Sequence, residues 1–436
     1  MELTKDEAIK ENDKLRKILE KSESNLKDES WKAQEYDNIQ KYSLQGVYNI
    51  FKKWLFIQDT NRIDVLLATV LSNQQKGTPV WLFPIGPSGD TKTEMILSFR
   101  GLDNVLIIDQ VTKNTLASGK PNTIDLGSKL QNNSTILIIP DLAALTSLHK
   151  DEKKQIWAQF RTLYDGYINK KTGSGVVKVY DNCHVTLIAC STPVLRDEYH
   201  INQQLGTREL LYDTEPDPNC SNDKMSKSWD NENYEMEMQE ELQDVVSGFF
   251  NYHRLKDIEI SKEIKDFIFK EAERLSILRA SGQVEYRYNE LISDVHPEIP
   301  TRVVKQFKRL YVALKSLDEN YPDKTAKAII KHIVDSSGDR VRQKIMNIFR
   351  RNPEDWLSIA NLQNKSKLGR TKVKIELETL WNIGWLVKEV REEVIGGWVD
   401  DSYGTEKRRG GRWQEVAYYR KVKEQLSFDN IGGGDC

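Results

Sequence analysis

Residues 80–99, VWLFPIGPSGDTKTEMILSF, decide the fold expected for this chain. They open with a short apolar run typical of a buried strand and continue into a turn, residues 86–93, that contains two glycines. Met95, Ile96 and Phe99 then follow at helical spacing. The stretch therefore predicts a strand, a tight turn and a helix in direct succession.

This order of elements is that of a P-loop. In a P-loop, backbone N–H groups at a helix N-terminus cradle phosphates, a lysine reaches the β and γ oxygens, and the next hydroxyl holds Mg²⁺. Thr91 stands where the motif has glycine, although two glycines remain in the turn. The sequence thus predicts an ATP and Mg²⁺ site with the nucleotide-contacting residues Gly86, Pro87, Ser88, Gly89, Asp90, Thr91, Lys92, Thr93 and Glu94.

The composition narrows the class of protein. The 436 residues allow two or three domains, and a net charge of −2 means that any nucleic-acid surface must be local. No apolar stretch is as long as a membrane span, and the polar N-terminus is not a signal peptide, so we expect a cytoplasmic protein without membrane contact. Four scattered cysteines predict a reducing compartment, without a zinc site or a disulfide framework.

Three further apolar runs, residues 105–108, 136–139 and 185–190, predict a parallel sheet. Helical patterns alternate with these runs, which indicates an α/β core with the sheet between helices. Ligands of such sheets bind at the carboxyl ends of the strands. The polar residues that directly follow each run are therefore candidates for the site.

An ATP-hydrolysing site needs a carboxylate near the Mg²⁺ ion. Asp109 follows the first run and Asp141 the second. We favour Asp141, because the strand beside the P-loop strand usually falls there, and Asp109 is then a cap at a strand end. The sequence is Pro140-Asp141, without the second acid that such sites normally carry. Either one carboxylate serves both roles or hydrolysis is slow.

Thr192 and Arg208 complete an ordered series. Thr192 follows the third run, where a polar side chain can orient the attacking water, and Arg208 comes shortly afterwards. An arginine there could reach the γ-phosphate held by a neighbouring subunit. The alternatives are a strand-end cap for Thr192 and an ion pair with a nearby carboxylate for Arg208. The order of P-loop, acid, polar strand end and arginine favours the catalytic interpretation.

This series resembles the AAA+ ATPases, and more specifically the minichromosome-maintenance-related helicases and the replication ATPases of plasmids, viruses and integrated elements. The resemblance implies the P-loop pair Lys92 and Thr93, the second-motif acid and Mg²⁺ ligand Asp141, the sensor Thr192, the arginine finger Arg208 and the lid sensor arginine Arg302. It implies a ring-forming homo-oligomer, possibly a hexamer, that acts on DNA as an ATP-driven helicase or translocase in replication or mobile-element maintenance. The alternative is an ATP-switched replication initiator or loader that binds DNA and hydrolyses slowly.

Residues 167–180 predict a β-hairpin whose turn contains two glycines. The family that the chain resembles places a hairpin here, pointing into a central channel and gripping DNA through lysine. Lys170, Lys171 and Lys178 fit that role as phosphate contacts. The alternative is an exposed hairpin with ordinary solubilising lysines.

The C-terminal part is locally basic, with nineteen Lys and Arg against twelve Asp and Glu in residues 340–426. Its pattern of three helices and a β-ribbon resembles a winged helix, in which the third helix enters the major groove of DNA. In that helix, residues 370–381, we expect Val373, Leu377, Leu380 and Trp381 to face inward. The resemblance implies the DNA contacts Arg370, Lys374, Arg408, Arg409 and Arg412. A winged helix used for protein contacts is the alternative.

The expected domains follow from these patterns. Residues 1–40 form a charged N-terminal helix, 41–212 an AAA+ core, 213–335 an acidic loop and a helical lid, 336–426 the winged helix and 427–436 a flexible tail. Within the third part, residues 213–233 are expected to be a loop.

Overall fold

The computed structural model describes residues 37–120, 123–171, 175–196, 207–214, 218–282, 284–285, 290–395 and 412–422. The strands of the largest sheet are β1 (Trp81–Ile85), β2 (Val105–Ile107), β3 (Ser134–Ile139), β6 (His184–Ala189) and β7 (Leu210–Asp213). The helices before and between them are α2 (Leu44–Trp54), α3 (Asn61–Ser72), α4 (Lys92–Leu97), η1 (Ser98–Gly101), α5 (Leu126–Leu130), α6 (Ala143–Thr146) and α7 (Lys150–Tyr164).

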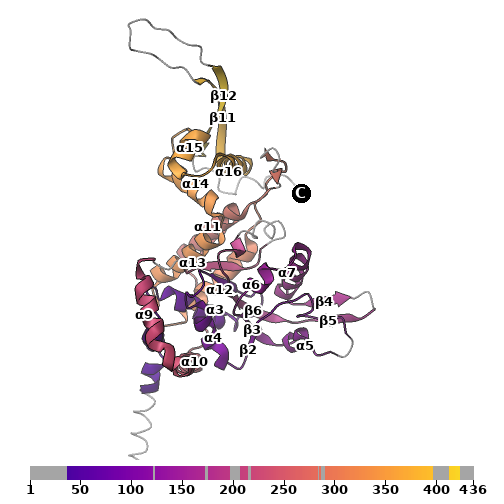
Figure 1. Cartoon of the computed structure of the whole chain (residues 1–436), viewed down its shortest axis with the longest axis vertical. Helices are drawn as coiled ribbons and strands as arrows, with labels where there is room; N and C mark the ends of the chain where they lie inside the picture. The colour runs from indigo at the N-terminus through magenta and orange to yellow at the C-terminus, as the bar shows by residue number, and fades with distance from the viewer. Residues whose placement is uncertain are drawn as a thin grey trace, which may run out of the picture.

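The five strands form a parallel sheet in the order β2-β3-β6-β1-β7, with the layout of a Rossmann-like core (Figure 1). The expected α/β class is confirmed. The expectation that the strand of Asp141 lies beside β1 is wrong, because β6 pairs with both β1 and β3. After β1 the chain crosses to β2 at one edge of the sheet and returns through β3 and β6. It then adds β7 on the other side of β1. The carboxyl end of β1 is therefore the switch point of the sheet, where ligands bind in folds of this kind.

Helices cover both faces of the sheet, because successive side chains of a strand point to opposite faces. On one face Leu82 and Ile138 belong to a buried cluster that includes apolar residues of α3 and of the helices that follow the sheet in the chain. On the other face Trp81 and Leu137 pack with the apolar residues of α7. The indole N–H of Trp81 donates to the carbonyl of Val185 at 2.7 Å, so this large side chain also has its polar group satisfied.

The β-hairpin expected at residues 167–180 is confirmed. It consists of β4 (Ile168–Lys171) and β5 (Val177–Tyr180), which pair antiparallel. The sequence predicts a loop at residues 213–233, and this prediction is wrong. The structure has η2 (Pro218–Cys220), α9 (Ser221–Asn231) and η3 (Glu232–Tyr234) there. Met225 and Trp229 are the apolar residues in α9, which are too few to predict a helix from periodicity. No residue of α9 is buried.

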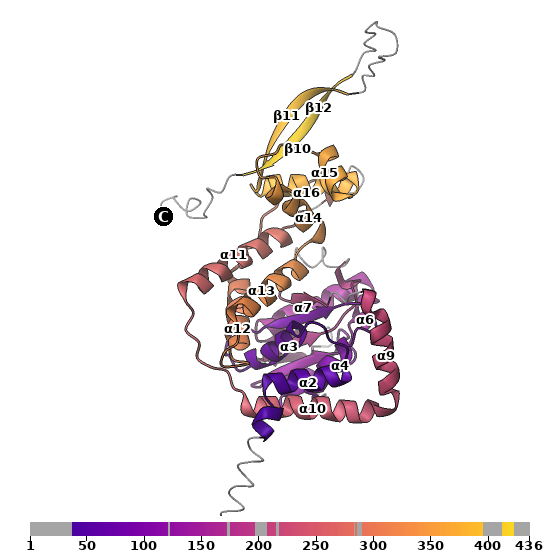
Figure 2. The ribbon, with the colours of Figure 1, turned by 90° about the vertical axis from the view of Figure 1, so that its left-hand side faces the viewer.

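A second group of helices lies beside the core (Figure 2). It contains α11 (Lys262–Arg279), α12 (Thr301–Lys315) and α13 (Asp323–Ser337), whereas α10 (Glu235–Tyr252) runs beside α2. The short strands β8 (Val284–Glu285) and β9 (Glu290–Leu291) follow α11 in the chain. The helices expected in the part of the chain after the acidic loop are present. The carboxylate of Asp64 on α3 accepts hydrogen bonds from Tyr48 on α2 and from Tyr321, which precedes α13. These bonds join the core to the lid helices.

The C-terminal elements are α14 (Arg340–Arg351), β10 (Leu357–Ser358), α15 (Ile359–Ser366), α16 (Arg370–Asn382), β11 (Leu386–Ile395) and β12 (Arg412–Lys421). The strands form an antiparallel sheet in the order β10-β12-β11, and the β11–β12 ribbon projects away from the core (Figure 1). Val373, Leu377 and Leu380 are buried as expected. The inward placement expected for Trp381 is wrong, because this residue is 44% exposed and Lys388 lies over its ring.

Asp213, the last residue of β7, joins this C-terminal part to the core. Its carboxylate pairs with Arg196, which follows β6, and with Arg340, the first residue of α14. Its backbone carbonyl bonds to the ring of His332 on α13 at 2.7 Å. Within the described residues no helix is long and apolar enough to cross a bilayer.

Candidate functional site

The turn after β1 is left-handed at two residues. Gly89 has a φ of +77° and Thr91 has a φ of +57°, directly before α4 begins at Lys92. Thr91 stands where the motif has glycine, and it adopts the left-handed conformation that glycine favours. A β-branched residue is strained there, and such strain persists only where the surrounding structure imposes it. The departure in sequence is therefore not a departure in backbone shape.

Lys92 is buried inside its own turn. Its ammonium group donates to the carbonyls of Gly86 at 3.0 Å and Pro87 at 2.6 Å. Burial lowers the pKa of Lys92, while the Asp90 and Asp141 carboxylates are among the charges that act in the other direction. The lysine thus bridges the two ends of the turn, and Asp141 is close enough to influence its charge.

Asp90 anchors the turn to two other segments. Its carboxylate pairs with Arg62 of α3 at 3.4 Å and with Lys224 of α9 at 2.8 Å. Burial opposes the charge of Asp90, but hydrogen bonds from Lys224 and Thr214 and the charge of Arg62 hold its pKa below the ordinary value. Neither cation was predicted from the sequence, since both lie far from the motif and belong to no recognised pattern.

Gly86 is required by a close approach of β7. A Cβ atom built on Gly86 would lie 2.0 Å from the hydroxyl of Thr214 and 3.0 Å from a carboxylate oxygen of Asp90. That hydroxyl donates to the carbonyl of Ile85 at 3.2 Å, which fixes the end of β7 against the end of β1. The first glycine of the motif is therefore needed for packing.

Asp141 and Thr192 follow strands that end at the same edge as the turn. The N–H of Gly86 donates to the carbonyl of Ser191 at 3.2 Å, so the residues directly before Thr192 touch the turn. The N–H of Leu142 donates to the carbonyl of Cys190 at 2.9 Å, which brings the end of β3 to the end of β6. Asp141 is exposed, and its carboxylate accepts from the N–H of Ala143 at 2.8 Å.

Asp109 lies farther from the turn than Asp141. It follows β2, the edge strand, and two strands separate β2 from β1, whereas one separates β3 from β1. At about 4.8 Å per strand, the offsets along the sheet are roughly 14 Å for Asp109 and 10 Å for Asp141. The preference for Asp141 stays a prediction, and the strand order favours it.

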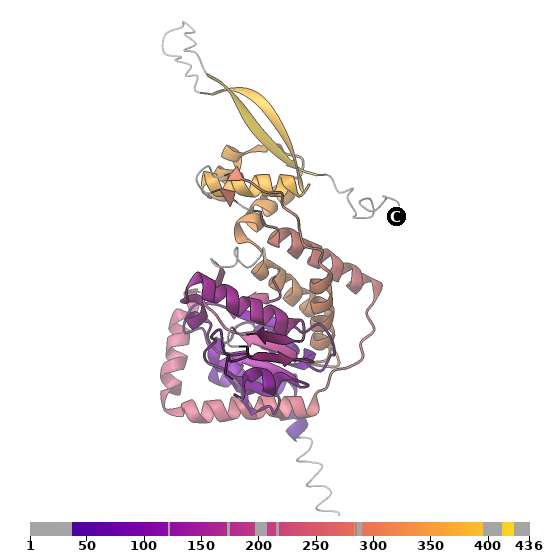
Figure 3. The ribbon, with the colours of Figure 1, turned by 90° about the vertical axis from the view of Figure 1, so that its right-hand side faces the viewer.

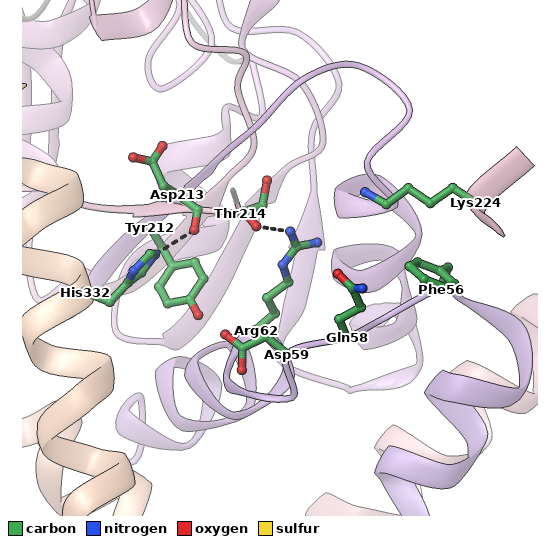
Figure 4. Close-up of a pocket in the computed structure, with 9 residues that line it drawn as sticks. All are labelled: Phe56, Gln58, Asp59, Arg62, Tyr212, Asp213, Thr214, Lys224 and His332. Carbon is green, nitrogen blue, oxygen red and sulfur yellow. Dashed lines mark hydrogen bonds between the residues drawn. The ribbon is translucent and has the colours of Figure 1, made fainter. Parts of the chain in front are cut away.

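A cavity of about 200 Å³ is lined by residues before and in α3, at the end of β7, on α9 and on α13 (Figure 4). Arg62 and Lys224, the two partners of Asp90, are part of its lining, and Figure 4 shows the Arg62 guanidinium pointing to the backbone oxygen of Thr214. On the opposite wall the rings of Tyr212 and His332 lie 4.5 Å apart. The cavity offers ring faces on one side and polar groups on the other.

Arg208 and Arg302 do not lie at this edge. Arg208 precedes β7 and pairs with Asp165 at 3.0 Å, and Arg302 of α12 donates to the carbonyl of Thr207 at 3.1 Å. Both guanidinium groups lie near the ring of Tyr164, at 5.8 and 6.0 Å. They therefore gather at the amino end of the parallel sheet, on the edge opposite Lys92. The ion pair considered as an alternative for Arg208 is present.

The Tyr164 hydroxyl sits beside these two arginines. It is buried and has no hydrogen-bond partner among the described residues. Burial raises its pKa, and the charges of Arg302 and Arg208 act against that rise. Tyr164 and Asp165 also line an open cavity of about 770 Å³ at this edge. The amino edge thus combines positive charge, an unbonded hydroxyl and space.

Two of the three hairpin lysines have partners within the chain. The Lys170 ammonium donates to the carbonyls of Lys113 and Ala117, both at 2.7 Å, and Lys178 forms a buried ion pair with Asp125 at 2.6 Å. The ammonium groups of these two lysines thus hold residues 113–118 and 123–125 against the hairpin, and these internal contacts argue against a role for them in DNA binding. Lys171 is exposed, and its expected role stays a prediction.

The C-terminal candidates are only partly covered. Arg370 is exposed at the start of α16 and Lys374 is half-buried one turn later. Arg408 and Arg409 lie outside the described residues, and Arg412 is the first residue of β12.

An aromatic–cation cluster that was not predicted lies on the small sheet of the C-terminal module. Arg391 and Arg420 lie over the ring of Trp356, at 5.3 and 4.7 Å. No pattern in the sequence indicates it, because Trp356, Arg391 and Arg420 come from three separate segments of the chain.

The described residues contain no group of three or more His, Cys, Asp or Glu side chains arranged to hold a metal ion. Mg²⁺ binds proteins through one or two side chains and completes its shell with phosphate oxygens and water. The exposed hydroxyl of Thr93 and the exposed carboxylate of Asp141 are suitable oxygen donors.

Comparisons with known proteins give little guidance. No family model matches the sequence, and no curated protein matches it. One similar solved structure is described as the A form apo structure of the NrS-1 C-terminal region. It has 13% sequence identity and a TM-score of 0.30, with 72% of each chain covered. That likeness is too low to carry an argument about fold or function, which therefore rest on the geometry of this chain.

Proposed function

We propose that this chain is an AAA+ type ATPase that binds ATP with Mg²⁺ and works on DNA as a homo-oligomeric ring, as a helicase or translocase. One observation carries the proposal. The carboxyl edge of the sheet collects the turn at residues 86–94 together with Asp141 and Thr192, while the opposite edge presents Arg208 and Arg302. Each subunit then holds one half of a site on each side.

The turn is suited to hold the phosphates. Incoming phosphate oxygens would replace the carbonyls of Gly86 and Pro87 as acceptors for the Lys92 ammonium. Thr93 and Asp141 would hold Mg²⁺, which when bound neutralises charge on the transferred phosphoryl group. Thr192 follows β6, the strand between those of the turn and of Asp141, where its hydroxyl can orient a water molecule.

The cavity beside the turn supports a nucleoside pocket. Its ring faces, from Tyr212 and His332, can stack on a base, and its polar wall at Arg62 is joined to the turn through Asp90. A phosphate chain on the turn and a base in the cavity would place one nucleotide across the junction of core and lid.

Arg208 and Arg302 would serve a neighbouring subunit. Both lie across the sheet from their own Lys92, so neither can reach the γ-phosphate that its own turn would hold. A guanidinium contributed by another chain stabilises the charge of the phosphoryl transition state. The site is then complete only in an assembly.

A winged-helix interpretation of the C-terminal elements supports DNA as the partner. Three helices, α14 to α16, pack with a three-stranded antiparallel sheet whose long ribbon projects from the module. Arg370 and Lys374 on α16, and Arg391 and Arg420 on the ribbon, supply cations for phosphate contact.

The test is nucleotide binding and turnover in matched lysine variants. Equilibrium binding of a fluorescent ATP analogue and steady-state ATPase, with and without DNA, are measured for the full chain, Lys92→Ala and Lys120→Ala. Lys120 is an exposed lysine outside the site and serves as the control. We expect Lys92→Ala to abolish hydrolysis and weaken binding, and Lys120→Ala to behave as the natural chain. Hydrolysis by Lys92→Ala at the natural rate would refute the proposal.

A second candidate is an ATP-switched initiator or loader with slow turnover. The residue after Asp141 is Leu142, which is apolar and 1% exposed, so this position offers no carboxylate to polarise water. ATP-dependent assembly on DNA, with hydrolysis that DNA does not accelerate, would favour the initiator over the motor.

A further inference from the structure

The helix α9 lies on the surface and has no buried residue. Met225 and Trp229, one turn apart on the same face, are 59% and 77% exposed, and Met236 at the start of α10 is 78% exposed. A helix of this length has little stability of its own in water. Large apolar side chains that are exposed together mark interaction surfaces. We therefore expect this face of α9 to contact a partner.

The same segment is acidic. Residues 221–240, here called the acidic strap, contain the exposed carboxylates of Glu235, Glu237 and Glu240. None of the three forms an ion pair with a described residue. The partner surface should therefore combine apolar and positively charged groups.

Such a surface exists on this chain, on the far side of the core. Lys305 and Lys308 of α12 are exposed and have no acidic partner among the described residues, and Ile299, just before α12, is 80% exposed. Figures 2 and 3 show α9 and α12 at opposite sides of the molecule. Arg208 lies next to this surface, since Gln306 of α12 donates to its carbonyl at 2.7 Å.

We propose that the acidic strap binds the α12 surface of a second copy of this chain. Because the two surfaces lie on opposite sides, the contact is head to tail, which generates rings or filaments. The proposal deepens the proposed function, since it names the surface through which the subunits would meet. The contact also reaches the candidate site, because Lys224 of the strap pairs with Asp90 of the turn. Docking of a neighbour on the strap would bring the neighbour's Arg208 toward that turn.

The first experiment removes the apolar anchor. Sedimentation velocity of the full chain, with and without a non-hydrolysable ATP analogue, is compared for the natural protein, Trp229→Ser and Trp381→Ser. Trp381 is an exposed tryptophan of the C-terminal module and serves as the matched control. Loss of a central aromatic anchor should raise the concentration for half-assembly about tenfold or more for Trp229→Ser only. Assembly of Trp229→Ser at the natural concentration would overturn the proposal.

The second experiment reverses the charges. One variant carries Glu235→Lys, Glu237→Lys and Glu240→Lys, and the other carries Lys305→Glu and Lys308→Glu. Each alone should fail to assemble, because its strap and its α12 surface then carry the same sign of charge. An equimolar mixture should assemble, because every strap again meets an α12 surface of opposite sign. A mixture that stays monomeric, while circular dichroism shows both variants folded, would count against the proposed contact.

Binding of the fluorescent ATP analogue in the same samples separates this proposal from the proposed function. A natural chain that stays monomeric at every concentration, while it binds nucleotide, overturns the strap contact and leaves the ATP site intact. Assembly that obeys the charge reversal in a chain that binds no nucleotide supports the strap contact and refutes the ATPase.

Discussion

Replacing Gly86 with alanine tests the packing that holds the turn against β7. The new Cβ atom would lie 2.0 Å from the Thr214 hydroxyl, whereas ordinary contact begins at 3.4 Å. The two groups must therefore separate by about 1.4 Å. Both ends of the contact are fixed, since that hydroxyl bonds to the carbonyl of Ile85 and Arg62 contacts the backbone carbonyl of Thr214. Overpacking of this kind typically costs about 1–3 kcal/mol, and we expect the turn to lose its shape.

The magnitude follows from the same contact. If about 2 kcal/mol of this cost is lost from the free energy of nucleotide binding, the dissociation constant of the ATP analogue should rise by roughly 30-fold. Thr214→Ala removes the hydroxyl and leaves the Thr214 Cβ at 3.3 Å, a separation that small shifts can relieve. Gly86→Ala combined with Thr214→Ala should therefore recover most of the loss, with a coupling of about 1 kcal/mol or more in a double-mutant cycle.

The assay is a titration of the fluorescent analogue against the four proteins of the cycle, with urea unfolding of each as a control for overall stability. Gly89→Ala is a useful comparison, because a Cβ there meets nothing within 4 Å and only the positive φ is strained. Natural affinity in Gly86→Ala, or the absence of coupling to Thr214, would refute the reasoning that glycine is required here by space.

Three further predictions concern the site and its support. Asp141→Asn should stop hydrolysis and leave assembly nearly intact, whereas Asp109→Asn should lower the hydrolysis rate much less. A steady-state ATPase assay in which Asp109→Asn has the larger effect would show that the catalytic acid follows β2 and not β3. Arg208→Ala should bind ATP but not hydrolyse it, and mixing it with Lys92→Ala should restore part of the rate, because some interfaces then pair two intact halves. No recovery at any ratio in mixed complexes would exclude action between subunits. Burial raises the pKa of Asp64 to about 6, against the hydrogen bonds from its tyrosine partners. The unfolded chain then loses this proton near pH 4 and the folded chain near pH 6, so stability falls between these values. Relative to Asp64→Asn, the natural chain should lose about 2 kcal/mol of unfolding free energy from pH 4 to pH 7, as measured by urea denaturation. A constant difference across this range would show that Asp64 stays ionised in the folded state.

Local patterns predicted most of the fold. The apolar runs of β1, β3 and β6 are continuous, which predicts strands that are buried on both faces, as the structure shows. The helices after the core have apolar residues at helical spacing, which predicts helices there. The order of the strands could not be predicted in this way. Each apolar run is buried on both faces at any interior position of the sheet, so its composition does not specify its neighbours. The placement of β6 between β1 and β3 follows from how the intervening helices pack, which spacing along the chain does not encode.

The site was predictable where one segment supplies several groups, and not where distant segments meet. The turn and the residues after each strand were found from the sequence, since the carboxyl ends of parallel strands share an edge. The partners of Asp90 come from α3 and α9, on either side of the motif in sequence. Lys170 and Lys178 look like free cations in a hairpin, and only their bonds to residues 112–125 show that they are structural.

The carboxylate of Asp213 links the core to the C-terminal module. It binds Arg340 at the start of α14, and the next residue, Thr214, lies against Gly86, the first glycine of the turn at residues 86–94. Two adjacent residues therefore connect that turn to the base of the C-terminal module. The ribbon strand β11 has 10 residues and is about 33 Å long. A rotation of about 10° at its base would therefore move its far end by roughly 6 Å.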